Sequence, residues 1–273
     1  MFNVNRSRTV PQTAFSMLLL IHENTVRSIR KEHSNAIIGL LMNIVQVLVM
    51  LAVFYLMVTL MGMRRTAIRG DFIVYLLSGI FIYQTNIRSV GAVASAEGPT
   101  SSMMLHAPMN MVISICSAAL GALYTQALSI LTILIAYDLA TGAVQILDPV
   151  GFACMIVLSW LNGISVGLVL LAFKPWWPAF FRIVQTLYRR ANMVASGKMF
   201  TANSLTATML AMFDWNPLFH IIDQARGFAF VNYFPRYTSI TYPVYVTIVL
   251  VVIGLMAEYF TRHRVSASWF AGK

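Results

Sequence analysis

The residues of this chain best suited to chemistry are arginines in the segment 179–200, the least apolar of its predicted membrane spans. On a helical wheel of that segment a polar stripe appears, made of Arg182, Thr186, Arg189, Met193 and Ser196, with Gln185 and Arg190 flanking it. An arginine buried in lipid costs at least about 2.5–3.5 kcal/mol, so the stripe must face water, protein or an anionic ligand. Two interpretations stay open: Arg182, Arg189 and Arg190 line a path for an anionic substrate, or they lie at the cytoplasmic interface.

Other chemistry is missing from the sequence. It has no HExxH, no paired CxxC and no GxSxG, and Gly197-Lys198 is followed by Met199, so it does not form a phosphate loop. The five histidines are scattered, the carboxylates are unpaired, and Cys116 and Cys154 lie in apolar stretches. We therefore expect no catalysis, no metal site and no cofactor in this chain.

The elements around these arginines are predicted from long stretches of sequence without formal charge. Residues 36–63, 98–137, 149–173 and 237–257 carry none, and a helix needs about 20 apolar residues to cross a bilayer. The hydrophobic fraction is 59 %, which excludes an ordinary soluble domain and a disordered chain. The net charge of +10 does not indicate nucleic-acid binding, because Lys and Arg concentrate at the chain ends and beside the spans, where they set the membrane topology. We predict an all-α polytopic membrane protein.

Six spans are predicted in a single domain over residues 36–273. They cover about Ala36–Leu60, Phe72–Ala94, Met111–Tyr137, Pro149–Phe173, Ala179–Phe200 and Tyr242–Tyr259. The excess of Lys and Arg on one side places both termini in the cytoplasm. Residues 1–35 are predicted to hold an amphipathic helix that either lies in the membrane interface or docks on a partner.

The segment Met212–Tyr242 is rich in aromatic residues, with nine among its 31 positions. A membrane-interface belt explains most of them, and a sugar-stacking platform is the sharper alternative. The candidates for the platform are Trp215, Phe219, Phe228 and Tyr233. Polar residues between the rings favour a re-entrant hairpin beside a wet vestibule.

Several motifs in order give the chain a recognisable likeness. Asp214-Trp215-Asn216-Pro217-Leu218-Phe219, with the residues up to Gly227, resembles the late Asn-Pro-Leu motif of ABC type-2 exporter permeases. The permeases for capsular polysaccharide and related lipid-linked glycans are the most similar. Ser196-Gly197, the stretch Gly254–Glu258 and the loop Glu97–Pro108 fit the same family in order and spacing.

This resemblance implies six spans per subunit, a homodimer, and a separate cytoplasmic ABC ATPase subunit that holds ATP and Mg. The loop after the second span would couple to that ATPase through Glu97, Gly98, Pro99, Met103, His106 and Pro108. The amphipathic helix would lie at the cytoplasmic interface. Residues of about Thr201–Phe230 would form short re-entrant helices on the far side.

The leading hypothesis is the permease of an exporter in a bacterial inner membrane, which moves a lipid-linked, acidic, capsular-type polysaccharide. Systems of this kind add a periplasmic adaptor and an outer-membrane channel. The alternatives are export of a teichoic-type polymer, a lipid or a drug, a membrane-embedded glycan-modifying enzyme, or an ion-coupled carrier. The enzyme would need a nucleophile–base pair at one depth, and the carrier would need intramembrane carboxylates.

Overall fold

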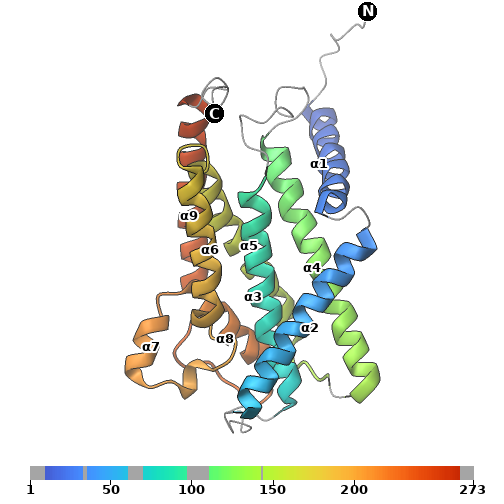
Figure 1. Cartoon of the computed structure of the whole chain (residues 1–273), viewed down its shortest axis with the longest axis vertical. Coiled ribbons are helices and arrows are strands. Elements are labelled where there is room, and N and C mark those ends of the chain that lie inside the picture. The colour runs from blue at the N-terminus through green and yellow to red at the C-terminus, as the bar shows by residue number, and fades with distance from the viewer. Residues whose placement is uncertain (1–9, 33–35, 61–69, 97–110, 143, 265–273) are drawn as a thin grey trace, which may run out of the picture.

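The described part of the chain is built from helices alone. The computed structural model describes residues 10–32, 36–60, 70–96, 111–142 and 144–264, so the expected coupling loop at 97–108 lies outside it. The elements, drawn in Figure 1, are α1 (Val10–Glu32), α2 (Ala36–Leu60), α3 (Phe72–Ala94), α4 (Met111–Thr141), α5 (Pro149–Phe173), α6 (Pro178–Ala195), η2 (Ala202–Ser204), α7 (Ala207–Phe213), α8 (Pro217–Ala229) and α9 (Thr241–Arg264).

Helices α2, α3 and α5 begin and end where the sequence predicts. Helix α6 ends five residues earlier than expected, because Gly197 follows its C-cap with φ +71°, a left-handed conformation that stops a helix and suits glycine. Helix α4 runs on to Thr141, where Gly142 at φ +62° ends it in the same way. Residues 196–201 are therefore a turn, not the last turn of a span.

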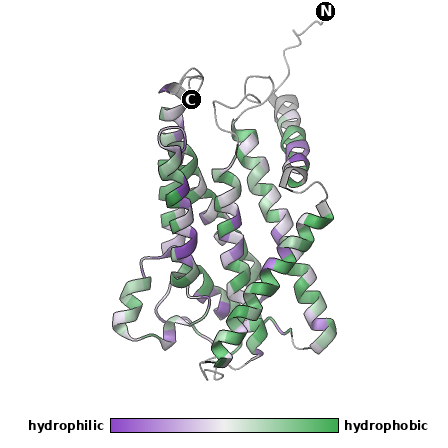
Figure 2. Cartoon of the chain, in the orientation of Figure 1, coloured by the Kyte–Doolittle hydropathy of each residue, from purple (hydrophilic) through white to green (hydrophobic). Residues whose placement is uncertain are grey.

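Four of the described helices are long and apolar enough to cross a membrane: Ile37–Leu60, Met111–Thr141, Pro149–Phe173 and Thr241–Thr261. On α2 and α9 many large apolar side chains are exposed, as expected of surfaces that face lipid. Figure 2 shows these helices mostly green, with purple turns midway along α3 and α6. The chain is thus an all-α membrane protein whose polar residues gather on particular helices.

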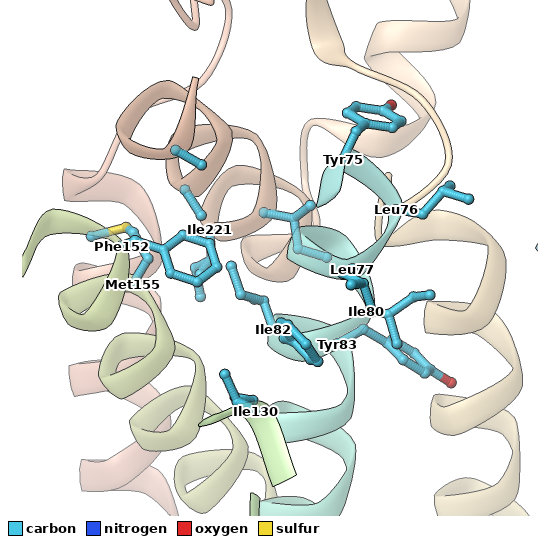
Figure 3. Packing of buried hydrophobic residues seen from close by; sticks show 14 of the residues in the cluster. Tyr75, Leu76, Leu77, Ile80, Ile82, Tyr83, Ile130, Phe152, Met155 and Ile221 are labelled. Carbon is cyan, nitrogen blue, oxygen red and sulfur yellow. The ribbon is translucent and has the colours of Figure 1, made fainter. Parts of the chain in front are cut away.

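Helix α3 forms the centre of the molecule and is buried on nearly every side. It packs against α2, α4, α5 and α8, and Figure 3 shows Tyr83 and Leu76 pointing away from Phe152 and Met155, which lie on the other side of it. Polar residues on this helix therefore face protein, which is why it can carry more of them than a lipid-facing span.

Two glycines on α5 let that helix approach α3 closely. A Cβ at Gly163 would stand 2.6 Å from the Asn86 carbonyl oxygen, and one at Gly167 would stand 2.8 Å from Val93 Cβ. The two glycines are four residues apart, the small-xxx-small spacing that brings membrane helices together. This close contact fixes α3, and with it the polar residues that α3 carries.

Helix α1 is present as predicted and packs on α4. Ser28 lies over Gly121, and Ser117 Oγ donates to the Ile21 carbonyl oxygen at 3.1 Å. Its small polar residues thus face the protein, while Leu18 and Leu19 are exposed. An exposed apolar face fits a helix at a membrane interface, which is one of the two predicted placements.

Candidate functional site

A pocket of about 690 Å³ opens among α2, α3, α4 and α6. Its volume lies within the range of roughly 300–1,000 Å³ that is usual for ligand sites. The lining consists of Gln46, Val49, Met50, Val53 and Phe54 from α2, Tyr83, Gln84, Ile87, Arg88, Gly91, Ala92 and Ser95 from α3 and its C-cap, Ala122 and Thr125 from α4, and Gln185, Arg189, Arg190 and Met193 from α6. Apolar side chains of α2 thus face polar and charged side chains of α3 and α6 across this hollow.

Three arginines give this pocket its charge. Arg88 is half-buried, and its Nη2 donates to Gln46 Oε1 at 3.0 Å, a bond that joins α3 to α2. An Nη2 of Arg189 lies 3.9 Å from the position that a Cβ would take at Gly91, which follows Arg88 by three residues. The described lining includes no aspartate or glutamate, so positive charge from two helices meets there without an acidic side chain.

Helix α6 is held beside α3 by two tyrosine hydroxyls. Tyr83 donates to the Arg189 carbonyl oxygen at 3.2 Å, and Tyr188 donates to Asn86 Oδ1 at 2.9 Å. Asn86 Nδ2 in turn donates to Asn162 Oδ1 at 3.0 Å, and Asn162 reaches Thr247 on α9. A buried polar network of this kind sets the position of a helix that has few apolar contacts of its own.

Lys198 lies against Tyr83 and Phe54, two aromatic residues of the pocket lining. Its side chain is 1 % exposed, and Nζ stands 3.6 Å from the ring centroid of Tyr83 and 4.8 Å from that of Phe54. Among the described residues Nζ has no hydrogen-bond partner. The residue is in the turn after α6, outside the four candidate spans, and burial lowers its pKa to about 7.

The turn that carries Lys198 is fixed by the fully buried Arg226 of α8. Its Nη1 donates to the carbonyl oxygens of Gly197 at 2.9 Å and Phe200 at 2.6 Å, and its Nη2 donates to that of Lys198 at 2.6 Å. The guanidinium also lies 4.2 Å from the Tyr75 ring centroid. Arg226 therefore holds α8 against the end of α6.

The predicted arginine stripe is divided by the structure. Arg182, Arg189 and Arg190 are all exposed in the single chain, but only Arg189 and Arg190 line the pocket. Arg88, which does line it, was not predicted as a site residue; the signal for it was a lone arginine within an apolar span. Glu97, Gly98, Pro99, Met103, His106 and Pro108 lie outside the described residues.

The four aromatic candidates lie in different surroundings. Trp215 is 66 % exposed and donates to the Met212 carbonyl oxygen, whereas Phe219 is buried. The Phe228 ring packs against the start of α5. Tyr233 is buried in the α8–α9 loop and donates to Asp223 Oδ1; burial and that carboxylate raise the pKa of its hydroxyl.

Metal chemistry has no visible support in the described ranges, where no three His, Cys, Asp or Glu side chains gather as a metal site requires. What the pocket can do is bind: it offers guanidinium and amide groups, and none of the lining groups is a nucleophile paired with a base.

Comparison with known proteins agrees with the motifs. No family model matches the chain. Two Escherichia coli proteins, both named polysialic acid transport protein KpsM, are 28 % and 27 % identical to it over 211 residues, which is 74 % of this chain and 78 % of each relative. These relatives confirm that this multi-pass membrane protein resembles the permeases of ABC type-2 exporters for capsular polysaccharide.

Proposed function

We propose that this chain is the permease subunit of an ATP-driven ABC exporter that moves a lipid-linked, acidic, capsular-type polysaccharide across a bacterial inner membrane. The similarity to the polysialic acid transport proteins carries the proposal. The sequence has no phosphate loop, so the energy must come from a separate ATPase subunit that holds ATP and Mg.

Six spans are proposed, namely the four candidate spans with α3 and α6 added. Figure 1 supports this, because α2, α4 and α6 run in one direction and α3 and α9 in the other. Helix α3 is not among the four candidate spans because its polar residues lower its mean hydropathy, and most of these residues are buried in protein. The last turns of α3 and α9 and the first turn of α4 lie at one end of the molecule, which we assign to the cytoplasm together with both termini.

The route is proposed to run between two copies of the chain, in one domain per subunit over residues 36–273. ATP binding would draw the ATPase subunits together, and the loop at 97–108 would pass that motion to α2 and α6. On the far side α7 and α8 would form the re-entrant segment. A periplasmic adaptor and an outer-membrane channel would complete the path.

Reconstitution tests whether ATP hydrolysis belongs to the partner subunit and not to this chain. The purified chain in lipid discs should hydrolyse no ATP, and hydrolysis should appear with the ATPase subunit encoded beside it. Deleting the chain in its host should remove surface polysaccharide and leave the polymer inside the cell. Hydrolysis by the lone chain, or normal surface polysaccharide after deletion, contradicts the proposal.

A further inference from the structure

We propose that the pocket among α2, α3, α4 and α6 binds an oxyanion of the exported molecule through Arg88, Arg189 and Arg190. The group is a sugar carboxylate or the phosphate of a lipid anchor, and either one presents two oxygen acceptors that a guanidinium binds in a bidentate way. This inference rests on the proposed function and assigns that substrate a binding site.

The first argument is convergence. Arg88 and Arg189 come from different helices, yet the Arg189 guanidinium lies beside Gly91, less than one turn from Arg88 and about 4.5 Å from it along the axis. The missing side chain at Gly91 leaves the space that the guanidinium approaches. Arg190 lines the same pocket from the next position of α6.

The second argument is uncompensated charge. Within the described ranges no ion pair joins Arg189 or Arg190 to a carboxylate, and the described lining is free of acidic side chains. Guanidinium groups that share one pocket repel one another, and a bound anion offsets that repulsion because it attracts each of them. A neutral sugar would leave the repulsion in place.

The third argument is preorganisation. Gln46 Oε1 accepts from Arg88 Nη2, which holds that guanidinium toward α2. The Arg189 backbone is fixed by the Tyr83 hydroxyl. Gln84 and Gln185 also line the pocket and offer amide groups to sugar hydroxyls. Arginines that are already in place lose less side-chain freedom when an anion arrives.

Calorimetric titration of the full chain in neutral phosphatidylcholine discs tests the site. Four probes separate the chemistry: a sialic acid tetramer supplies carboxylates, lysophosphatidic acid supplies a phosphate, and maltotetraose and monoacylglycerol are their uncharged counterparts. We expect at least one anionic probe to bind about tenfold or more tightly than its neutral counterpart. Which of the two does so identifies the source of the oxyanion.

The variants Arg88→Gln, Arg189→Gln and Arg190→Gln should each weaken that binding by about tenfold. Arg182→Gln is the matched control, since it removes an exposed arginine of the same helix outside the pocket, and it should bind as the wild type does. Arg88→Lys keeps the charge and should bind the anion more tightly than Arg88→Gln does. Such a rescue would show that Arg88→Gln loses binding through its charge and not through misfolding.

Three results would overturn the site: no anionic probe binds the wild type, neutral probes bind as tightly, or Arg182→Gln weakens binding as much as the pocket variants. The proposed export function can fail while the binding site is confirmed. If the anion binds as expected but the chain does not stimulate a partner ATPase, the site stands and the function is wrong.

Discussion

The Tyr188 hydroxyl donates a 2.9 Å hydrogen bond to Asn86 Oδ1, which ties the arginine-bearing helix α6 to the centre of α3. Asn86 is fully buried, and its amide also donates to the Ser159 carbonyl oxygen and to Asn162 Oδ1. The side of the pocket that carries Arg189 and Arg190 is thus positioned by a polar network, not by apolar packing alone.

Tyr188→Phe tests that network. The change leaves Asn86 Oδ1 without its hydroxyl donor, and we expect the free energy of unfolding to fall by about 0.6 kcal/mol, the average for such bonds between membrane helices, and by at most about 1.7 kcal/mol. Denaturant titration in detergent micelles measures it. Tyr245→Phe, at an exposed position of α9, is the control and should be neutral. Equal losses in the two variants would show that the bond contributes nothing.

Local pattern was enough to predict most of the fold. Uncharged stretches predicted the bounds of α2 and α5, because lipid forces each apolar stretch into one uninterrupted helix. The early end of α6 was harder to predict, because it depends on Gly197 adopting a left-handed conformation, which hydropathy does not report.

The candidate site was predictable only in part. The helical wheel put Arg182 and Arg189 on one face, but they are seven residues and so about 10 Å apart along the axis, and the pocket reaches only from Gln185 to Met193 on α6. Arg88 joins the pocket through the packing of α3 beside α6, a tertiary relation that no periodicity within one segment contains.

Gly163→Ala should weaken the α3–α5 contact. The new methyl group would stand 2.6 Å from a backbone oxygen that cannot move without shifting α3, and overpacking of this kind costs about 1–3 kcal/mol. Thermal unfolding followed by tryptophan fluorescence would measure the loss.

The matched control is Gly91→Ala on α3, where the nearest atom beyond its own helix would be 3.9 Å away. Both changes gain the same helix propensity, so the difference between them isolates the clash. If Gly91→Ala lowers the melting temperature as much as Gly163→Ala, the close approach of the two helices is not what Gly163 provides.

Asn216 caps α8 and also fastens it to α6. Its Oδ1 accepts from the Leu218 N–H at 3.1 Å, and its Nδ2 donates to Asn192 Oδ1 and to the Ala195 carbonyl oxygen. Asn216→Ala loses both functions, while Asn216→Ser keeps a capping oxygen. We expect the alanine variant to be less stable than the serine variant by about 1 kcal/mol in denaturant titration. Equal stabilities would assign the role of Asn216 to its bonds with α6 alone.

Lys198 gives a prediction about pH. Its pKa is about 7 in the folded chain against an ordinary 10.5, so between these values the unfolded chain binds more protons, and this residue makes stability rise with pH. Below pH 7 its destabilising effect is complete, and above about pH 10.5 it vanishes. The ring faces of Tyr83 and Phe54 offset only part of the cost of burying the ammonium group.

Lys198→Met removes this titration and keeps a long apolar side chain in the same space. The variant should therefore melt at a higher temperature than the wild type near neutral pH, and its advantage should shrink steadily as the pH approaches about 10.5. Melting curves of both proteins, recorded in one detergent across that range, give the difference directly, so titration of all other groups cancels. A difference that stays constant with pH would mean that Lys198 keeps its ordinary proton affinity, held by the aromatic rings.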